Sequence, residues 1–124
     1  MKKYAIGLDY GTLSGRAVLV DVENGEVIAQ HTKVYDHGVM EKSLPDGTTL
    51  PADWALEHPQ DFIDVLMETI PAVMKMSGVS SEDVISIGVD FTASTSMPVD
   101  ESGEPLCFKP EFSSNPHAWV KLWK

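Results

Sequence analysis

Residues 6–19 read Ile-Gly-Leu-Asp-Tyr-Gly-Thr-Leu-Ser-Gly-Arg-Ala-Val-Leu. An apolar run ends at Asp9, a short turn follows, and a second apolar run begins after Gly15. This pattern predicts a β-hairpin with a carboxylate at its tip. We expect Gly11 and Gly15 to adopt positive φ angles there, which would also let a ligand approach the backbone closely.

The polar residues of this turn suit phosphate and a metal ion. Thr12 and Ser14 offer hydroxyl groups beside backbone N–H groups, a combination that binds phosphate oxygens. Asp9 is a candidate ligand of the Mg²⁺ that accompanies a nucleotide, either directly or through water. Arg16 either adds a charge-assisted contact or is structural. A glycine-rich turn with an exposed aspartate is the alternative that involves no ligand.

The same turn carries a family resemblance. Residues 9–16, Asp-Tyr-Gly-Thr-Leu-Ser-Gly-Arg, resemble the first phosphate motif of the FGGY carbohydrate kinases, Asp-x-Gly-Thr-x-Ser-x-Arg. The variant with Tyr10 and Gly15, together with Gly-Val-Asp-Phe-Thr-Ala at 88–93, resembles the members that phosphorylate L-ribulose. The resemblance covers essentially all 124 residues. Because such kinases are several times longer, it implies that residues 1–124 are part of an N-terminal kinase domain.

The resemblance implies an α/β fold of the ribonuclease H-like (actin-like ATPase) type. This N-terminal domain would be incomplete, with a mixed sheet of three antiparallel strands followed by a helix and a further strand. ATP and Mg²⁺ would be the cofactors, and Asp9 would serve the metal. The phosphates would be bound by Gly11, Thr12, Ser14 and Arg16. The sugar would be contacted by Thr92, Ala93 and Ser94. The family's catalytic base and adenosine pocket lie in later regions, so no catalytic residue is expected here.

Composition narrows the possible partners. A chain of 124 residues is one domain at most, and 43% apolar residues indicate a globular chain. Nineteen acidic and nine basic residues give a net charge of −10, which argues against a nucleic-acid partner. No apolar run is long enough to span a membrane. Cys107 is the single cysteine, so neither a disulfide framework nor a cysteine zinc site is expected, in keeping with a cytoplasmic location.

The first third of the chain predicts three consecutive strands. They cover residues 4–9, 16–22 and 26–34, and the third is expected near a sheet edge. Asn24-Gly25 predicts a type I′ turn between the second and third strands. Residues 35–57 show no sustained period and predict a long loop, in which Trp54 either covers a ligand or packs against the protein.

The middle of the chain predicts a helix and then a buried strand. The helix covers about 59–77, begins at Pro59 and ends before Gly78, and Pro71 should kink or split it. The four histidines show no metal-ligand spacing, and His58 is a candidate cap for this helix. Residues 84–90 predict a buried strand that ends at Asp90. Since Asp9 and Asp90 both end apolar strands, we expect Asp9 and the segment 90–94 to border one cleft.

Two further elements are predicted before the chain ends. Residues 95–100 and 105–108 predict a hairpin around Glu-Ser-Gly at 101–103. Asn115 and Pro116 predict the start of a truncated helix from about residue 116. Trp119 and Trp123 would lie on its apolar face, which if exposed would favour self-association.

Three functions agree with these features. The leading one is the N-terminal part of an ATP-dependent kinase that phosphorylates a pentulose, with L-ribulose preferred. We expect the fragment alone to be inactive. A ribonuclease H-like nuclease would use Asp9 and Asp90 to hold metals, but the net charge opposes it. A non-catalytic protein-interaction module would use the terminal tryptophans.

Overall fold

The computed structural model describes residues 1–122, which form two compact units. Unit 1 consists of residues 1–35 and 62–91, and unit 2 of residues 36–61 and the chain from 92 onward. Each unit therefore combines two separate stretches of sequence.

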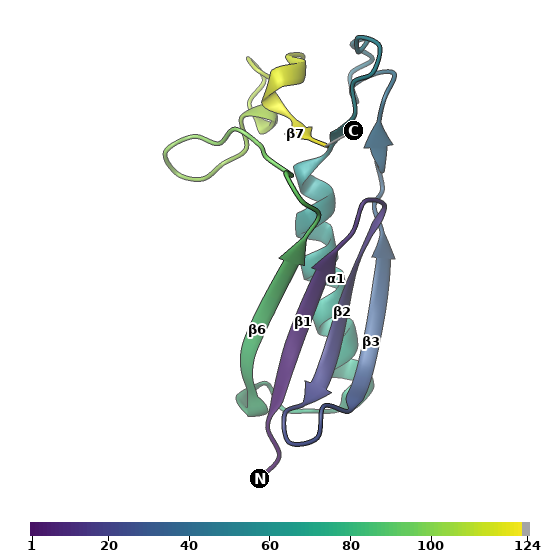
Figure 1. Cartoon of the computed structure of the whole chain (residues 1–124). Helices are drawn as coiled ribbons and strands as arrows, with labels where there is room; N and C mark the ends of the chain where they lie inside the picture. The colour runs from purple at the N-terminus through teal and green to yellow at the C-terminus, as the bar shows by residue number, and fades with distance from the viewer. Residues whose placement is uncertain (123–124) are drawn as a thin grey trace. The chain divides into compact units, whose positions relative to one another are not determined.

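Unit 1 is built on a four-stranded sheet in the order β3-β2-β1-β6 (Figure 1). The strands are β1 (Tyr4–Tyr10), β2 (Ser14–Asp21), β3 (Val27–Val34) and β6 (Val84–Phe91). β2 pairs antiparallel with both β1 and β3, whereas β6 pairs parallel with β1. The predicted mixed sheet of three antiparallel strands followed by a helix and a further strand is confirmed, and β3 lies at an edge.

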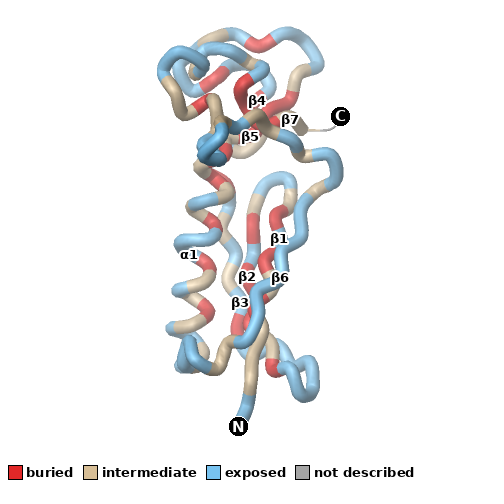
Figure 2. Tube along the Cα trace, turned by 90° about the vertical axis from the view of Figure 1, so that its left-hand side faces the viewer, coloured by how far each residue is buried: buried red, intermediate tan, exposed pale blue. Residues whose placement is uncertain are grey.

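The helix α1 (Pro59–Ser77) is continuous through Pro71. Pro71 has no N–H group to donate to the carbonyl of Met67, four residues earlier. Both residues are exposed, so water can solvate that carbonyl. His58 caps the helix start as predicted, because its Nδ1 accepts a hydrogen bond from the N–H of Gln60 at 3.1 Å. Figure 2 shows buried positions along one side of α1 and along β1 and β2. The core of unit 1 contains Ile6, Leu8, Tyr10, Ala17, Leu19, Ala29, Tyr35, Val65 and Val73.

The turn between β2 and β3 differs from the prediction. Among the residues of this turn, Gly25 alone has a positive φ angle, 75°, whereas a type I′ turn requires positive φ at two residues. The N–H of Asp21 donates to the carbonyl of Glu26 at 2.9 Å, and the N–H of Gly25 donates to the carbonyl of Asp21 at 2.8 Å. A longer loop with one left-handed residue therefore joins the strands.

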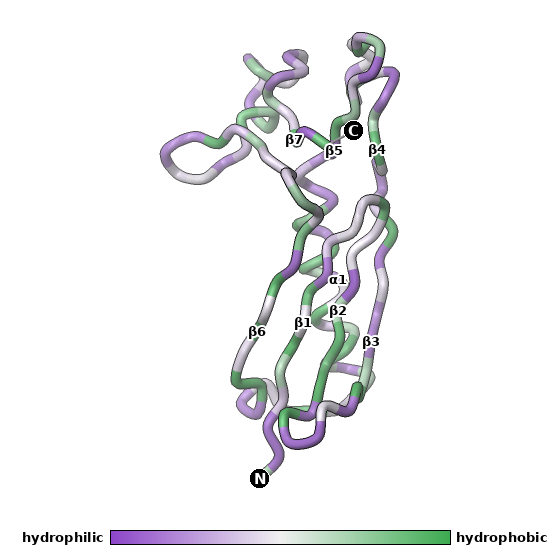
Figure 3. The backbone as a smooth tube through the Cα atoms, in the orientation of Figure 1, coloured by the Kyte–Doolittle hydropathy of each residue, from purple (hydrophilic) through white to green (hydrophobic). Residues whose placement is uncertain are grey.

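The predicted burial of β6 is wrong. Ile85, Ile87, Val89 and Phe91 are between 51% and 60% exposed, and they alternate with Ser86, Gly88 and Asp90 along the strand (Figures 2 and 3). The reason is position: β6 is an edge strand, and the unit 1 core is formed mainly by β1, β2 and α1. Apolar residues at alternate positions are typical of a strand with one covered face, and the described chain does not supply that cover.

Unit 2 contains a small three-stranded sheet in the order β4-β5-β7. Its strands are β4 (Val39–Met40), β5 (Leu56–Glu57) and β7 (Val120–Lys121). The region 35–57 is therefore no simple loop. Its apolar residues form a core with the end of the chain, made of Met40, Leu44, Leu50, Leu56, Cys107, Ala118 and Trp119. Trp54 packs beside this core, as one of its two predicted roles required.

The predicted helix from about residue 116 is also wrong. Asn115 does act as a cap, accepting from the N–H of His117 at 3.0 Å, but only one 3₁₀ turn follows, η3 (Pro116–Ala118). The chain then enters β7, whose pairing with β5 replaces helical hydrogen bonds. Trp119 is 4% exposed and its Nε1–H donates to the carbonyl of Ser113 at 3.1 Å, so it cannot form an exposed face. Trp123 lies outside the described residues.

The predicted hairpin around residues 101–103 is present only as a turn. Val99 and Pro105 form a bridge, and the N–H of Asp100 donates to the carbonyl of Glu104 at 2.9 Å. The second predicted arm is instead a 3₁₀ turn, η2 (Leu106–Phe108). Cys107 lies in this turn and is buried in the unit 2 core.

Candidate phosphate and metal site

The tip of the β1–β2 hairpin is fixed by hydrogen bonds. Inside the tip, the N–H of Gly11 donates to the carbonyl of Ser14 at 2.8 Å. From outside, Tyr35 donates its Oη–H to the carbonyl of Gly11 at 2.7 Å and its N–H to the carbonyl of Leu13 at 2.9 Å. Sequence reasoning missed Tyr35, because nothing in the sequence pairs it with a turn more than twenty residues earlier.

The two glycines of the tip act differently from the prediction. Neither Gly11 nor Gly15 has a positive φ angle. A Cβ atom at Gly15 would lie 2.4 Å from Cγ1 of Val65, so the absence of a side chain lets α1 pack against β2. A Cβ atom at Gly11 would lie 3.2 Å from the carbonyl oxygen of Ser14, across the hydrogen-bonded tip. Close packing, rather than backbone handedness, explains both glycines.

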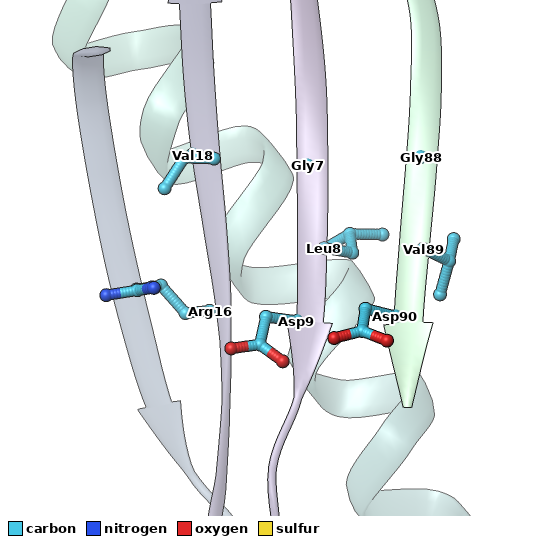
Figure 4. Close-up of a pocket in the computed structure, with 8 residues that line it drawn as sticks. All are labelled: Gly7, Leu8, Asp9, Arg16, Val18, Gly88, Val89 and Asp90. Carbon is cyan, nitrogen blue, oxygen red and sulfur yellow. The ribbon is translucent and has the colours of Figure 1, made fainter. Parts of the chain in front are cut away.

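Asp9 and Asp90 lie side by side on the sheet. They are register partners on the parallel strands β1 and β6, and both are exposed. Successive side chains of a strand point to opposite faces, so Asp9 faces away from the core that contains Leu8 and Tyr10. Figure 4 shows the two carboxylates next to each other, with the side chain of Arg16 extending away from Asp9. The predicted shared cleft is therefore confirmed for Asp9 and Asp90.

Both aspartates line a groove of about 280 Å³, which we call the outer groove. Its lining is Gly7, Leu8, Asp9, Arg16, Val18, Gly88, Val89 and Asp90. Gly7 and Gly88 are register partners and present no side chain, so a ligand could approach the backbone of the two central strands. This groove thus combines two carboxylates, one guanidinium group and an open backbone floor.

A second pocket of about 260 Å³ lies at the hairpin tip, and we call it the tip pocket. It is lined by Asp9, Gly11, Ser14, Arg16 and Thr32. Asp9 and Arg16 line both pockets, so the outer groove and the tip pocket are neighbours. Thr32 was missed from sequence. Thr32 on β3 lies opposite Arg16 on β2, and only the correct alignment of these two strands would have placed it near the pocket. Thr12 is exposed but does not line either pocket.

Two stacked aromatic rings hold the strand ends that carry the aspartates. The rings of Tyr10 and Phe91 are 4.8 Å apart between centroids and nearly parallel, at 5°. Tyr10 also donates its Oη–H to the carbonyl of Phe62 on α1 at 2.9 Å. Burial raises the pKa of Tyr10, so the phenol stays protonated and remains a donor. These contacts fix the residues that follow Asp9 and Asp90 in sequence.

The segment 92–94 belongs to unit 2 and forms a tight turn. Oγ1 of Thr92 and Oγ1 of Thr95 are 2.6 Å apart, and the hydroxyl of Thr95 also donates to the carbonyl of Thr92 at 2.8 Å. Ser94 has a positive φ angle of 59°, and Ala93 and Ser94 are exposed. The turn therefore presents its tip to solvent while the Thr92 hydroxyl is engaged within it.

The carboxylates fit a magnesium ion bound together with a ligand. Within residues 1–122, no three His, Cys, Asp or Glu side chains are placed to hold a metal by themselves. Mg²⁺ typically keeps several waters and uses one or two protein carboxylates beside phosphate oxygens. Asp9 and Asp90 meet that requirement.

Within residues 1–122, no helix is long and apolar enough to cross a membrane.

Comparison with known proteins identifies the family to which this chain belongs. The model of the FGGY family of carbohydrate kinases, N-terminal domain, matches residues 4–109. The chain belongs to the FGGY family of carbohydrate kinases. Solved structures agree on the fold: a gluconate kinase from Lactobacillus acidophilus aligns with a TM-score of 0.65 at 22% identity, over 84% of this chain and 18% of that chain. A ligand-bound xylulose kinase from the same organism gives 0.64 at 22% identity, over 82% and 18%.

Curated relatives are more similar in sequence. The ribulokinase of Geobacillus thermodenitrificans is 60% identical over 99% of this chain. The ribulokinases of Shouchella clausii and Halalkalibacterium halodurans are 54% and 57% identical over 100% and 98% of it. The chain spans 22% of the length of each of these three relatives.

Proposed function

We propose that these residues are the first part of an ATP-dependent kinase that phosphorylates a pentulose, with L-ribulose as the preferred substrate. One observation carries the proposal. The phosphate motif and the second carboxylate converge on adjoining pockets, in a chain that is 54% to 60% identical to ribulokinases. Domain boundaries follow from the same proposal: residues 1–124 form part of the kinase's N-terminal domain.

The hairpin would bind ATP. Asp9 serves the metal, with Asp90 beside it. The phosphate oxygens are bound by Gly11, Thr12, Ser14 and Arg16, of which all but Thr12 line the tip pocket. When bound, Mg²⁺ neutralises charge on the transferring phosphoryl group. The hydrogen bonds within the tip keep these protein donors in place without reorganisation during the reaction.

The turn at 92–94 would contact the sugar. Ala93 and Ser94 are exposed, and the bonds between Thr92 and Thr95 make the turn rigid. Ala93 offers only backbone groups, so it would recognise a sugar hydroxyl through its N–H or carbonyl. The base that accepts the proton of the sugar hydroxyl and the adenosine pocket would lie in the remainder of the longer protein.

The nuclease alternative is not retained. Asp9 and Asp90 are paired as such an enzyme would need, but the family match and the net charge of −10 favour the kinase. The interaction module is not retained either, because Trp119 is buried in unit 2.

A single substitution in the full-length protein tests the proposal. Asp9→Asn keeps the shape of the side chain and removes its charge. We expect sugar-dependent ADP release to fall at least about tenfold, roughly 1.4 kcal/mol of barrier, and the Mg²⁺ requirement to rise.

Asp53→Asn is the matched control. Asp53 is an exposed aspartate of unit 2 with a φ angle of 66°, a conformation that asparagine also tolerates. It should leave turnover unchanged. Wild-type turnover by Asp9→Asn at limiting Mg²⁺ would exclude a metal role for Asp9.

A further inference from the structure

Tyr35 holds the hairpin tip from the core of unit 1. Its side chain is 4% exposed, and its ring meets the edge of Phe62 at 5.6 Å between centroids and 75°. The ring is therefore anchored, while the hydroxyl and the backbone N–H reach Gly11 and Leu13 at 2.7 and 2.9 Å. One rigid residue thus makes two of the hydrogen bonds that shape the tip.

These hydrogen bonds set the direction of the tip's backbone. Both carbonyls that Tyr35 engages belong to the tip, and the third bond joins Gly11 to Ser14. None of the three bonds uses the N–H group of Thr12 or Ser14. Because a peptide group is planar, fixing the carbonyls of Gly11 and Leu13 orients the N–H groups of Thr12 and Ser14, and phosphate binding requires such N–H groups to converge.

We propose that Tyr35 is a positioning residue that keeps the hairpin tip in its phosphate-binding conformation. This inference rests on the proposed kinase function. The hydroxyl does not touch a substrate. It fixes the backbone that does, so removing it should weaken ATP binding more than it slows the chemical step.

The test compares Tyr35→Phe with Tyr4→Phe in the full-length protein. Tyr4 is a half-buried tyrosine of β1 that packs against the same core, so it controls for loss of a phenolic hydroxyl. We expect Tyr35→Phe to raise KM for ATP about threefold to tenfold, the net effect of one hydrogen bond. KM for the sugar and the thermal midpoint should match those of Tyr4→Phe.

Equal KM values for ATP in the two variants, or a change confined to kcat, would refute the positioning role. A wild-type protein that releases no sugar-dependent ADP would instead remove the kinase function, and the Tyr35 role with it. A failure of the positioning role can therefore be distinguished from a failure of the kinase function.

Unit 2 buries two carboxylates in a region that also contains two imidazoles. Glu57 and Asp61 are each 1% exposed. Asp61 accepts hydrogen bonds from Nδ1 of His37 at 2.7 Å and from the N–H of His37 at 3.2 Å. The ring of His58 stacks on that of His37, with centroids 4.0 Å apart, and meets Trp119 edge-on at 4.8 Å. Asp61 is thus well partnered.

Glu57 is not partnered in this way. Both of its carboxylate oxygens are buried and make no hydrogen bond within the described chain. The strands on either side place Val39 and Val120 opposite it, which carry no charge. Lys121 follows on β7, but its Nζ lies 4.4 Å from the ring centre of Trp54 and 3.1 Å from Nδ1 of His117.

The charge that acts on Glu57 is that of Asp61, which has the same sign. Burial and this charge together raise the pKa of Glu57 to about 7. A buried carboxylate without a partner is strongly unfavourable, and protonation removes the charge. We infer that folded unit 2 holds Glu57 as an uncharged acid, so that release of its proton loosens this unit. Glu57 is then a pH-sensitive element of the fold.

The sign of the effect follows from proton linkage. The ordinary pKa of Glu57 is 4.5, and the folded value is about 7. Between these values the folded chain holds a proton that the unfolded chain has lost, so stability falls as pH rises through this window and levels off above it. The full difference corresponds to a change on the order of a hundredfold in the unfolding equilibrium constant.

Tryptophan fluorescence of the 124-residue chain can follow unit 2 selectively. Trp54 and Trp119 belong to unit 2, whereas residues 1–35 and 62–91 contain no tryptophan. Urea unfolding at several values between pH 5 and pH 8 should show the wild-type midpoint falling with pH. Glu57→Gln keeps the shape and cannot ionise, so at pH 8 it should unfold with a constant at least about tenfold smaller than wild type.

Glu101→Gln is the matched control, since Glu101 is an exposed glutamate in a turn of unit 2. It should keep the wild-type pH dependence. The urea midpoint of Glu57→Gln should depend on pH less steeply than that of the wild type. A wild-type slope in Glu57→Gln would overturn the inference.

Infrared spectroscopy of the wild-type chain gives an independent readout if Glu57→Gln does not fold. A protonated carboxylic acid that absorbs at pH 6 and disappears by pH 8 supports the inference. Absence of that band at pH 6 refutes it.

Discussion

The carboxylates of the two units lie in contrasting environments. Unit 1 exposes Asp9 and Asp90 at a groove, where water solvates them and a cation can approach. Unit 2 buries Glu57 without a hydrogen-bond partner in the described chain. Unit 1 also buries Asp21, but that carboxylate lies 3.2 Å from Lys2 and accepts from the N–H of Glu23. Exposed or partnered carboxylates keep their charge, whereas an unpartnered buried one changes its protonation instead.

The units also differ in how their chain segments are joined. The first three strands of unit 1 follow one another in sequence, so neighbouring turns can specify their pairing. Unit 2 pairs β5 with β7, more than sixty residues later in the chain. The candidate binding residues of unit 1 therefore lie in short sequence motifs, whereas the stability of unit 2 depends on contacts between distant segments.

The largest expected effect concerns catalysis by the isolated chain. The 124 residues should give no sugar-dependent ADP release with ATP and Mg²⁺, because donor, metal and acceptor must be held together for phosphoryl transfer. The proposed phosphate hairpin of unit 1 and the proposed sugar contact at 92–94 would be only part of such a site. A coupled assay with L-ribulose and related pentuloses checks this. Sustained turnover that copurifies with the chain would show that unit 1's groove needs no further domain.

The next effect tests whether Trp119 belongs to the core of unit 2. Trp119→Ala should destabilise unit 2 by about 3–5 kcal/mol, since it removes a buried aromatic side chain. Urea unfolding followed by Trp54 fluorescence measures it. Trp54→Ala, at a partly buried position, should have a smaller effect when followed by circular dichroism. A small effect of Trp119→Ala would mean that unit 2 does not depend on its distant segment.

A smaller effect is expected from crowding in unit 1. Gly15→Ala places a Cβ atom 2.4 Å from Cγ1 of Val65 and should destabilise the chain by about 1–3 kcal/mol. Gly88→Ala is the control, because its Cβ atom would meet nothing within 4 Å. Thermal unfolding by circular dichroism compares the two. Equal midpoints would mean that α1 can move away from β2 without loss.

The smallest effect concerns the turn after Val99. Asp100 lies 2.8 Å from Nζ of Lys109 and accepts bonds from Ser102 and Glu104, and these contacts hold its pKa well below the ordinary range. Its contribution is therefore present at neutral pH and is lost only as pH falls into strongly acid conditions. Asp100→Asn should slightly lower the urea midpoint at pH 7. A higher midpoint would mean that these contacts do not stabilise the turn.

The sequence predicted correctly the elements that depend on residues close to one another along the chain. The β1–β2 hairpin and α1 with its His58 cap both depend on residues within a few positions of one another. The pairing of Asp9 with Asp90 was also predictable, because parallel strands end at the same edge. The failures at β6 and at residue 116 share another cause. Burial and strand pairing there depend on distant neighbours, which local periodicity does not record.

By itself, the sequence determined the hairpin and the helix, since the spacing of glycines, polar and apolar residues specifies both of them locally. Residues 9–16 also carry the resemblance to the family that the family model then showed. Only the tertiary structure decided that Gly15 is needed for packing against Val65, that Tyr35 holds the tip, and that Thr32 joins the pocket. It also decided that Trp119 becomes core and that Glu57 is buried without a partner in the described chain. Each of these depends on which distant side chains meet, and burial then sets packing and protonation.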